Sequence, residues 1–163
     1  MIKIMTVSFF GHREINDMRA VENAMDTYVD ELLHRYEYID FLVGKNGDFD
    51  TIVSASVRRN KRRFGNDNSS LCLVLPYMTA EYANNQKYYS DYYDEIEVYE
   101  KSMKSHFKKA YQTRNRYMVD RSYIVVFYVS HTSGGAYQTM QYAKKQEKTI
   151  INFAMDNGQN NRM

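Results

Sequence analysis

Short apolar runs alternate with longer segments of helical period along most of the chain. The apolar runs are rich in β-branched and aromatic residues, which is typical of strands, and the longer segments repeat apolar residues at the spacing of one helix face. This order predicts an α/β fold, a three-layer sandwich in which helices cover both faces of a mainly parallel central sheet. The predicted strands span residues 3–10, 38–43, 70–75, 96–99, 122–129 and 149–153.

The clearest predicted helix follows Asn16 or Asp17, either of which can cap its amino end. Further helices are predicted over residues 50–64 and 102–119, and from Gly134 and Gly135 to about residue 145. The first helix has one apolar face, which carries Val21, Ala24, Met25, Tyr28, Leu32 and Leu33.

Residues 77–100 interrupt this alternation, because their tyrosines are mixed with Asn, Asp and Glu at neither the helical nor the strand period. We interpret this segment as an insert within a single domain over residues 1–155, followed by a flexible tail over residues 156–163. Its tyrosines suit a lid over a ligand, a surface that stacks on a base, or a dimer contact, and these alternatives stay open. They are Tyr88, Tyr89, Tyr92 and Tyr93.

Cysteine usage and hydropathy predict a cytoplasmic protein without membrane contact. The only cysteine, Cys72, lies in an apolar run and has no partner for a disulfide. The first strand reaches charged residues too soon for a secretory signal, and no apolar segment approaches the roughly 20 residues that a membrane span needs.

The formal net charge of +2 over 163 residues gives no general electrostatic case for nucleic acid as the main partner. The densest basic run, residues 58–63, is interpreted first as solvated surface in a last helical turn, where the dipole favours positive charge. No metal and no cofactor is predicted, since the four histidines are scattered and the cysteine stands alone. The chain also lacks a Walker-type loop and the three-glycine dinucleotide fingerprint, which argues against ordinary NTPases and dehydrogenases.

Five of the seven glycines fall directly after a predicted strand. In an open parallel sheet the carboxyl ends of the strands share one edge, ligands bind in the crevice there, and glycine lets backbone N–H groups approach a phosphate. We therefore expect these loops to converge on a bound anion. The five are Gly11, Gly44, Gly47, Gly134 and Gly135.

The first and last of these loops supply the main candidates. Gly11 is followed by His12 and Arg13, whose guanidinium suits a phosphate or carboxylate; the alternative is a plain turn with a solvated arginine. The last loop presents free N–H groups at the positive end of a helix dipole, with hydroxyl donors beside them. Its alternative is an ordinary N-cap by Ser133, and its His131 is given no catalytic role. The candidates here are Thr132, Ser133, Gly134 and Gly135.

Two further segments supply candidates. Gly44 precedes Lys45, which can bind an anion, and Asn46, which can bind a base or ribose edge. Asp48 or Asp50 can bind a hydroxyl or simply cap the next helix. Near the end of the helix over residues 102–119, a basic face either projects toward the same crevice or is solvated surface. Its candidates are Arg114 and Asn115.

Three short motifs give the chain a resemblance to a known family. They are Phe-Phe-Gly-His-Arg at residues 9–13, Arg-Asn-Arg-Tyr-Met at 114–118 and Ser-Gly-Gly-Ala at 133–136. Together they resemble the SLOG superfamily, and nearly the whole chain outside the tyrosine-rich insert is similar to its bacterial YpsA-like (DUF1273-like) branch. The resemblance implies a Rossmann-like fold that binds nucleotides or nucleotide-derived ligands, in a bacterial or phage protein. The positions carried over are Gly11, Arg13, Arg114, Asn115, Gly134 and Gly135.

One position departs from the catalytic members of that superfamily. The LOG phosphoribohydrolases and the similar deoxyribosyltransferases place a glutamate in the helix after the late glycines, where this chain has Gln138. A neutral amide can be neither a carboxylate nucleophile nor a charge that stabilises an oxocarbenium ion. Hydrolysis is therefore disfavoured unless Glu14, Asp48 or Asp50 takes that part, and no catalytic residue is assigned.

The sequence leaves three functions open. The first is binding, as a sensor or sequestering protein, of a nucleotide or ADP-ribose-type small molecule. The second is cleavage of the N-glycosidic or phosphate bond of a nucleotide, with His12 or an acidic loop residue as acid or base. The third is nucleic-acid binding like that of the superfamily member DprA, through residues 58–63 and exposed tyrosines. A homo-oligomer is expected by analogy alone.

Overall fold

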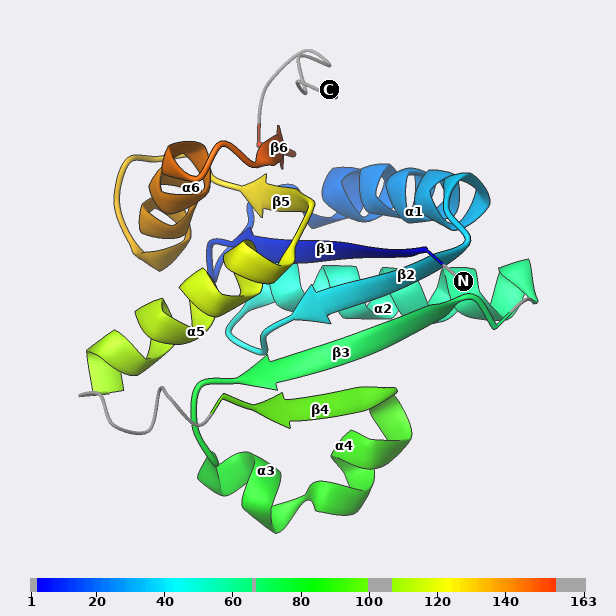
Figure 1. Cartoon of the computed structure of the whole chain (residues 1–163), viewed down its shortest axis with the longest axis horizontal. Coiled ribbons are helices and arrows are strands. Elements are labelled where there is room, and N and C mark those ends of the chain that lie inside the picture. The colour runs from blue at the N-terminus through cyan, green and yellow to red at the C-terminus, as the bar shows by residue number, and fades with distance from the viewer. Residues whose placement is uncertain (1–2, 66, 100–106, 155–163) are drawn as a thin grey trace.

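The central sheet has six parallel strands, in the order β4-β3-β2-β1-β5-β6, within the residues that this computed structural model describes, 3–65, 67–99 and 107–154 (Figure 1). Every ladder between neighbouring strands is parallel, which confirms the predicted α/β class. The strands are β1 Ile4–Gly11, β2 Tyr38–Val43, β3 Ser69–Leu75, β4 Glu95–Val98, β5 Ile124–Tyr128 and β6 Thr149–Asn152.

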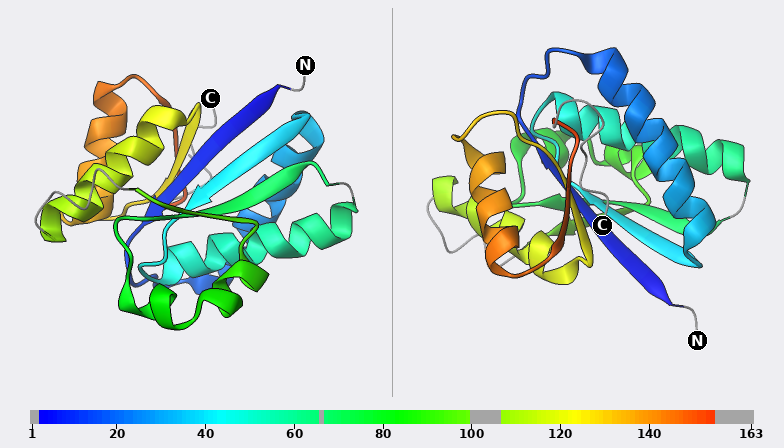
Figure 2. Two further views of the ribbon diagram at one scale, coloured as in Figure 1. Left: turned by 60° about the horizontal axis from the view of Figure 1, so that its bottom comes forward. Right: turned by 90° about the horizontal axis from the view of Figure 1, so that it is seen from above.

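Helices pack on both faces of the sheet and make the three-layer, Rossmann-like sandwich that the sequence predicts (Figure 2). One face carries α1 Met18–Arg35 and α2 Asp48–Phe64, and the other carries α5 Phe107–Arg121 and α6 Gly135–Lys145. The predicted start of the third of these helices at residue 102 lies outside the described residues, as does the predicted tail over residues 156–163.

The two faces of the sheet bury separate apolar clusters, because successive residues of a strand point to opposite sides. Phe9 and Phe41 pack in the cluster under α1 and α2, whereas Phe10 and Leu42 pack in the cluster under α5 and α6. β3 is buried along its whole length, as expected for a strand with a neighbour on each side. Its Cys72 is buried, and the thiol is free.

The starts of α1 and α2 follow from different residues. Asp17 caps α1 by accepting a hydrogen bond from the N–H of Ala20 at 3.3 Å, which settles the choice between Asn16 and Asp17. α2 begins at Asp48, two residues before the predicted start, and its N-cap is Gly47 without a side-chain cap.

The tyrosine-rich segment 77–100 contains two short helices, α3 Ala80–Asn84 and α4 Gln86–Tyr92, and then the edge strand β4. We predicted neither helix, because elements of five and seven residues are too short to display a helical period. Thr79 caps α3 through a hydrogen bond from the N–H of Tyr82 at 3.1 Å. Tyr89 and Tyr93 are buried in the cluster under α1 and α2, so the segment packs onto the same core.

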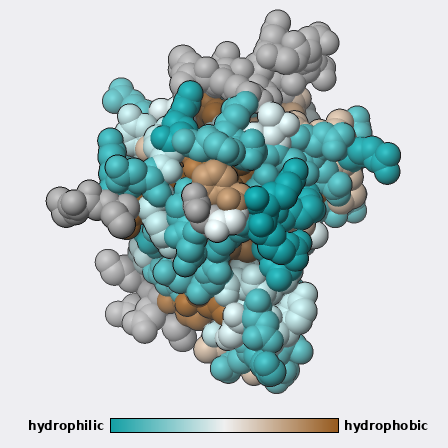
Figure 3. All heavy atoms as spheres, turned by 90° about the vertical axis from the view of Figure 1, so that its right-hand side faces the viewer, coloured by the Kyte–Doolittle hydropathy of each residue, from teal (hydrophilic) through white to brown (hydrophobic). Residues whose placement is uncertain are grey.

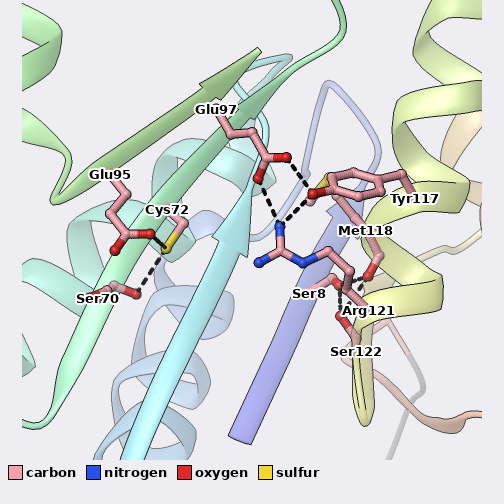
Figure 4. A network of polar contacts seen from close by, with 9 residues as sticks. All are labelled: Ser8, Ser70, Cys72, Glu95, Glu97, Tyr117, Met118, Arg121 and Ser122. Carbon is pink, nitrogen blue, oxygen red and sulfur yellow. Dashed lines mark hydrogen bonds and ion pairs between the residues drawn. The ribbon is translucent and has the colours of Figure 1, made fainter. Parts of the chain in front are cut away.

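Polar contacts fix the carboxyl end of α5 to the sheet (Figure 4). Arg121 Nη1 donates to Glu97 Oε1 on β4 at 2.8 Å, and the Tyr117 hydroxyl donates to the same carboxylate. Ser8 Oγ on β1 donates to the carbonyl of Met118 at 3.0 Å. These contacts hold α5 across the sheet, so that its preceding turns lie near the carboxyl ends of the strands.

The strand order reverses at β1, which lies between β2 and β5. In an open parallel sheet such a reversal opens a crevice at the carboxyl ends of the strands, because the two crossovers leave in opposite directions. The fold therefore supplies a ligand crevice at the end of β1, where the sequence predicts that the glycine loops converge.

The opposite end of the sheet, where the strands begin, presents a mainly hydrophilic surface with small apolar patches (Figure 3). Ile4 and Tyr123 are exposed large apolar residues of the described part of the chain. None of the helices in that part is long and apolar enough to cross a membrane.

Candidate functional site

A cavity of about 680 Å³ lies at the carboxyl edge of the sheet, at the reversal beside β1. This volume is in the range of small-molecule sites, roughly 300–1,000 Å³. The cavity is lined by the end of β1 and the loop after it, by the loops after β2 and β5 with the first turns of α2 and α6, and by α5. The residues are Phe9, Phe10, Gly11, His12, Arg13, Glu14, Asn16, Gly44, Asn46, Asp50, Tyr111, Gln112, Arg114, Asn115, Ser130, His131, Gly134, Gly135 and Ala136.

Most of the candidates named from the sequence line this cavity, but Lys45, Gly47, Asp48, Thr132 and Ser133 do not. Lys45 is directed away, where its ammonium group pairs with Glu81. Ser133 contacts His131, whose Nδ1 lies 3.1 Å from the serine Oγ, and Thr132 is not among the lining residues. The candidates brought together are Gly11, His12, Arg13, Gly44, Asn46, Arg114, Asn115, Gly134 and Gly135.

The glycines before α2 are required by protein packing. A Cβ on Gly11 would lie 2.4 Å from Cγ of Phe49, and a Cβ on Gly47 would lie 2.4 Å from Cα of Arg13. A Cβ on Gly44 would lie 3.1 Å from Nη1 of Arg114. The missing side chain at these three positions therefore serves the packing of protein atoms, and the expectation that their backbone N–H groups approach a phosphate stays a prediction.

The late glycines are different, because their backbone is open. Gly134 is the N-cap of α6 at a φ of +90°, and nothing lies within 4 Å of the place of its Cβ. At Gly135 the nearest such atom is Gln112 Nε2 at 3.7 Å. The alternative of a Ser133 N-cap was wrong, because α6 has no side-chain cap. With no acidic residue in its first turn, the amino end of α6 is suited to an anion.

The amino end of α2 is unsuited to an anion. Its first turn carries Asp48 and Asp50, which supply negative charge of their own. Asp48 Oδ2 accepts from the N–H of Ile15 at 3.1 Å, and the N–H of Asp48 donates to the carbonyl of Arg13 at 2.8 Å. These bonds join the loop after β1 to the loop after β2 and hold both walls of the cavity in place.

The buried side chain of Arg114 holds the cavity wall together through hydrogen bonds. Its Nη1 donates to the carbonyl of Val74 at 2.7 Å, and its Nε donates to Oδ1 of Asn115 at 2.8 Å. With the Asn46 amide turned so that its oxygen faces the guanidinium, Nη2 donates to that oxygen at 2.8 Å. Its donors are thus directed at protein acceptors, which links the end of β3 to the loop after β2.

Asp50 lies beside this guanidinium. Its Oδ2 accepts from the N–H of Asn46 at 2.9 Å. Burial of the carboxyl group raises the pKa of Asp50 to about 6, while the Asn46 N–H and the Arg114 charge oppose that rise. The same burial lowers the pKa of Arg114, and Asp50 acts against that shift. Asp50 therefore has an electrostatic role in the wall, which the cap and hydroxyl alternatives did not include.

Two histidines from different loops meet at the cavity. The rings of His12 and His131 are stacked, with centroids 3.6 Å apart and planes inclined by 6°. His12 Nε2 accepts a hydrogen bond from the N–H of Ser130 at 2.9 Å. Burial, and then the proximity of His131, lower the pKa of His12. The accepting nitrogen and the lowered pKa both favour a neutral imidazole.

The sequence reasoning missed Tyr111 and Gln112, which line the cavity from α5. Helical spacing could have predicted both, because they precede Asn115 by four and three residues and therefore lie on its side of the helix. Gln112 Nε2 donates to Oε1 of Gln138 at 2.8 Å, which joins α5 to α6 across the cavity mouth. The predicted basic face of this helix is thus a mainly polar wall.

Metal ligands are not gathered at this site: within the described ranges, no group of three or more His, Cys, Asp or Glu side chains could hold a metal ion.

Comparison with known proteins bears on the fold. No protein-family model and no curated protein sequence matches the chain. Among solved structures, DNA processing protein A (DprA) from Streptococcus pneumoniae superimposes with a TM-score of 0.64 at 14% sequence identity, over 91% of this chain and 50% of that one. DprA from Helicobacter pylori, described for its single-stranded DNA binding mode, superimposes with a TM-score of 0.63 at 16% identity, over 91% of this chain and 64% of that one.

This chain has the Rossmann-like fold found in DprA. It spans between half and about two thirds of the length of the two DprA chains. At these identities the likeness shows the fold, and the assignment to the YpsA-like branch of the SLOG superfamily stays a prediction.

Proposed function

We propose that this protein binds a nucleotide or nucleotide-derived ligand in the cavity at the carboxyl edge of its sheet. The observation that carries the proposal is the uncapped amino end of α6, where the backbone of Gly134 and Gly135 is open. A phosphate at this position gains hydrogen bonds from free N–H groups and the favourable end of the helix dipole. Arg13, whose exposed side chain lies on the wall formed by the loop after β1, adds a second donor group.

The rest of the cavity suits a nucleoside. The stacked His12 and His131 rings offer an aromatic wall, and Tyr111 offers a second one. Gln112 and Asn16 bring amide groups that can donate to and accept from a base or a ribose. A cavity with several aromatic walls, a few polar groups and one anion position matches the composition of a nucleotide.

Binding without turnover is favoured over hydrolysis. Gln138 is neutral and accepts a hydrogen bond from Gln112. His12 Nε2 is committed to the N–H of Ser130, so the ring has no free basic nitrogen at that position. Asp50 is held inside the wall by Asn46, which leaves Glu14 as the exposed carboxylate of the cavity. Cleavage of a nucleotide stays as the alternative, with Glu14 as its acidic residue.

The likeness to DprA supports a second candidate, the binding of single-stranded nucleic acid, because the Helicobacter pylori protein is described as binding single-stranded DNA. The basic run 58–63 gives this candidate limited support. Arg59 pairs with Asp26 at 2.8 Å, and Lys61 pairs with Asp94 at 2.5 Å, so part of its charge is neutralised.

A charge placed at the amino end of α6 tests the first proposal. We expect a thermal-shift screen of the purified protein with nucleotides, NAD and ADP-ribose to find a stabilising ligand, which chromatography recovers intact. At 100 times its Kd such a ligand stabilises the fold by about 2.7 kcal/mol. Gly135→Asp should then weaken binding at least ~10-fold through like-charge repulsion, a cost of ~1.4 kcal/mol.

The matched control is Gly135→Asn, which has nearly the same shape without the charge and should bind much more tightly than Gly135→Asp. Both variants should fold, because Asp and Asn are tolerated near a helix amino end and the space beside residue 135 is open. Equal affinities for the two variants would contradict the proposed anion position. A ligand recovered cleaved would establish an enzyme instead.

A further inference from the structure

A second, smaller cavity of about 120 Å³ lies beside the first. Gly44 and Asp50 line both cavities, so the loop after β2 and the first turn of α2 form a wall that they share. On its far side the small cavity is lined by α2 and by the tyrosines of α4. We call this cavity the tyrosine slot and define it by Lys45, Ser54, Tyr88, Tyr92 and Tyr93.

One of the residues that line the tyrosine slot has a buried hydroxyl without a partner. Ser54, on α2, is 2% exposed and lines the slot, and its Oγ has no hydrogen-bond partner. Buried polar side chains are nearly always hydrogen-bonded, since an unsatisfied group loses its interaction with water and regains nothing. A ligand that reaches into the slot with a donor or acceptor would supply the missing partner.

The charges around the slot are already compensated. The Lys45 ammonium pairs with Glu81 and lies 5.1 Å from the centre of the Tyr89 ring. The guanidinium of Arg58 lies over the Tyr92 ring, 4.2 Å from its centre. Because the ammonium has a carboxylate partner and the guanidinium rests on an aromatic face, the slot has no strong preference for an anion. It suits an uncharged group.

The walls of the slot are aromatic and partly open. The Tyr88 and Tyr92 rings are inclined by 23° with centroids 6.1 Å apart, and Tyr88 is 60% exposed. Tyr93 closes the buried side. A planar heterocycle gains stacking on such faces without any need for a particular base, and the Ser54 hydroxyl can then bond its polar edge.

We infer that the tyrosine slot binds the base of a second nucleotide, linked to the nucleotide in the main cavity. This inference rests on the proposed function and narrows its ligand to two linked nucleotides, either a dinucleotide or the end of a single strand. The linkage crosses the loop after β2 at Lys45 and Asn46, whose residues separate the two cavities.

Calorimetric titration with defined probes tests the inference. The probes are the four 5′-phosphorylated deoxymononucleotides and the four matching 5′-phosphorylated homodinucleotides. We expect a dinucleotide to bind about 5- to 150-fold more tightly than its mononucleotide, the range for one stacked base. Tyr88→Ala should remove most of this difference and leave mononucleotide binding unchanged. Ser54→Ala should also weaken only the dinucleotide, while the thermal stability of the free protein stays equal or rises.

Tyr123→Ala is the matched control, because Tyr123 is as exposed as Tyr88 but lies at the opposite end of the sheet. The inference is overturned if a mononucleotide binds and no dinucleotide binds more tightly, or if Tyr88→Ala weakens both probes equally; the proposed function survives either result. If neither probe binds, the inference fails, and the proposed function fails with it only when the screen with NAD and ADP-ribose also finds no ligand. If a dinucleotide does bind more tightly, a longer 5′-phosphorylated strand and a cyclic dinucleotide separate the two sources of the ligand. Tight, Tyr88-dependent binding of the longer strand identifies a strand end, and such binding of the cyclic dinucleotide alone identifies a dinucleotide.

Discussion

The imidazole rings of His12 and His131 stack face to face, with centroids 3.6 Å apart. Beside this contact, Nε2 of His12 accepts a hydrogen bond from the N–H of Ser130, which lies 118 positions further along the chain. This contact joins the loop after β1 to the loop after β5, the two loops that carry Arg13 and the late glycines. It also makes the order of the site depend on the protonation of one ring, because Nε2 of His12 can accept that N–H only while it carries no proton.

Acid should therefore destabilise the protein through His12. Burial and His131 lower its pKa in the folded state, so the unfolded chain takes up the proton first as the pH falls. The stability from this ring is present above the unfolded pKa of about 6.5 and is lost as the pH falls through the folded value. In His12→Gln the amide oxygen can still accept the Ser130 N–H but does not titrate. Between about pH 8 and pH 5 the free energy of unfolding measured in urea should therefore fall less for this variant than for wild type. Equal pH slopes would refute this role.

Asp50 should have the opposite pH dependence. Its folded pKa is raised to about 6, so the folded state gains a proton before the unfolded chain does, and the contribution of this group is lost as the pH rises through about 6. Asp50→Asn resembles the protonated acid and does not titrate. The free energy of unfolding of the variant, relative to wild type, should thus increase between about pH 4 and pH 7. A decrease would mean that attraction to Arg114 outweighs burial of the carboxylate.

Arg114 should contribute far more to the stability of the fold than Arg116, its neighbour on α5. Lysine cannot reproduce the two bonds from Nη1 and Nε to Val74 and Asn115, and Arg114→Lys leaves buried acceptors without partners. We expect a loss of about 3–5 kcal/mol in the free energy of unfolding, as for breaking a buried charged network. Arg116 is exposed, so Arg116→Lys should change stability by less than about 0.5 kcal/mol. Similar denaturant midpoints for the two variants would contradict the buried role.

Alanine should have opposite effects at two glycines that both lie at helix amino ends. Gly47 has extended backbone, which alanine adopts easily, but its Cβ would lie 2.4 Å from Cα of Arg13. Because backbone atoms cannot move aside cheaply, Gly47→Ala should cost about 1–3 kcal/mol. Gly135→Ala meets only Gln112 Nε2 at 3.7 Å and should be neutral or stabilising by up to about 1 kcal/mol. Thermal unfolding of both variants measures the difference, and a tolerated alanine at position 47 would disprove the close approach of the two loops.

The elements of this fold were largely predictable because they leave local patterns. Strand and helix periods come from residues two to four positions apart, which is why the four long helices and the six strands were expected near their observed places. The short helices α3 and α4 were not expected, since neither is long enough to repeat its pattern. The exposed, uncapped backbone at Gly134 and Gly135 was also within reach of the sequence, because a glycine pair between a strand and a helix is a local feature.

The sequence by itself thus determined the layers of the fold, the edge of the sheet where the loops meet and the glycines that lie in those loops. Only the tertiary structure decided what each of those residues does. The backbone of Gly47 packs closely against that of Arg13, and Arg114 donates to the carbonyl of Val74, 40 positions away. Lys45 pairs with Glu81, which lies in a segment with no clear period. These roles depend on how loops from distant parts of the chain pack against one another, and neither helical nor strand periodicity carries information about contacts over such distances.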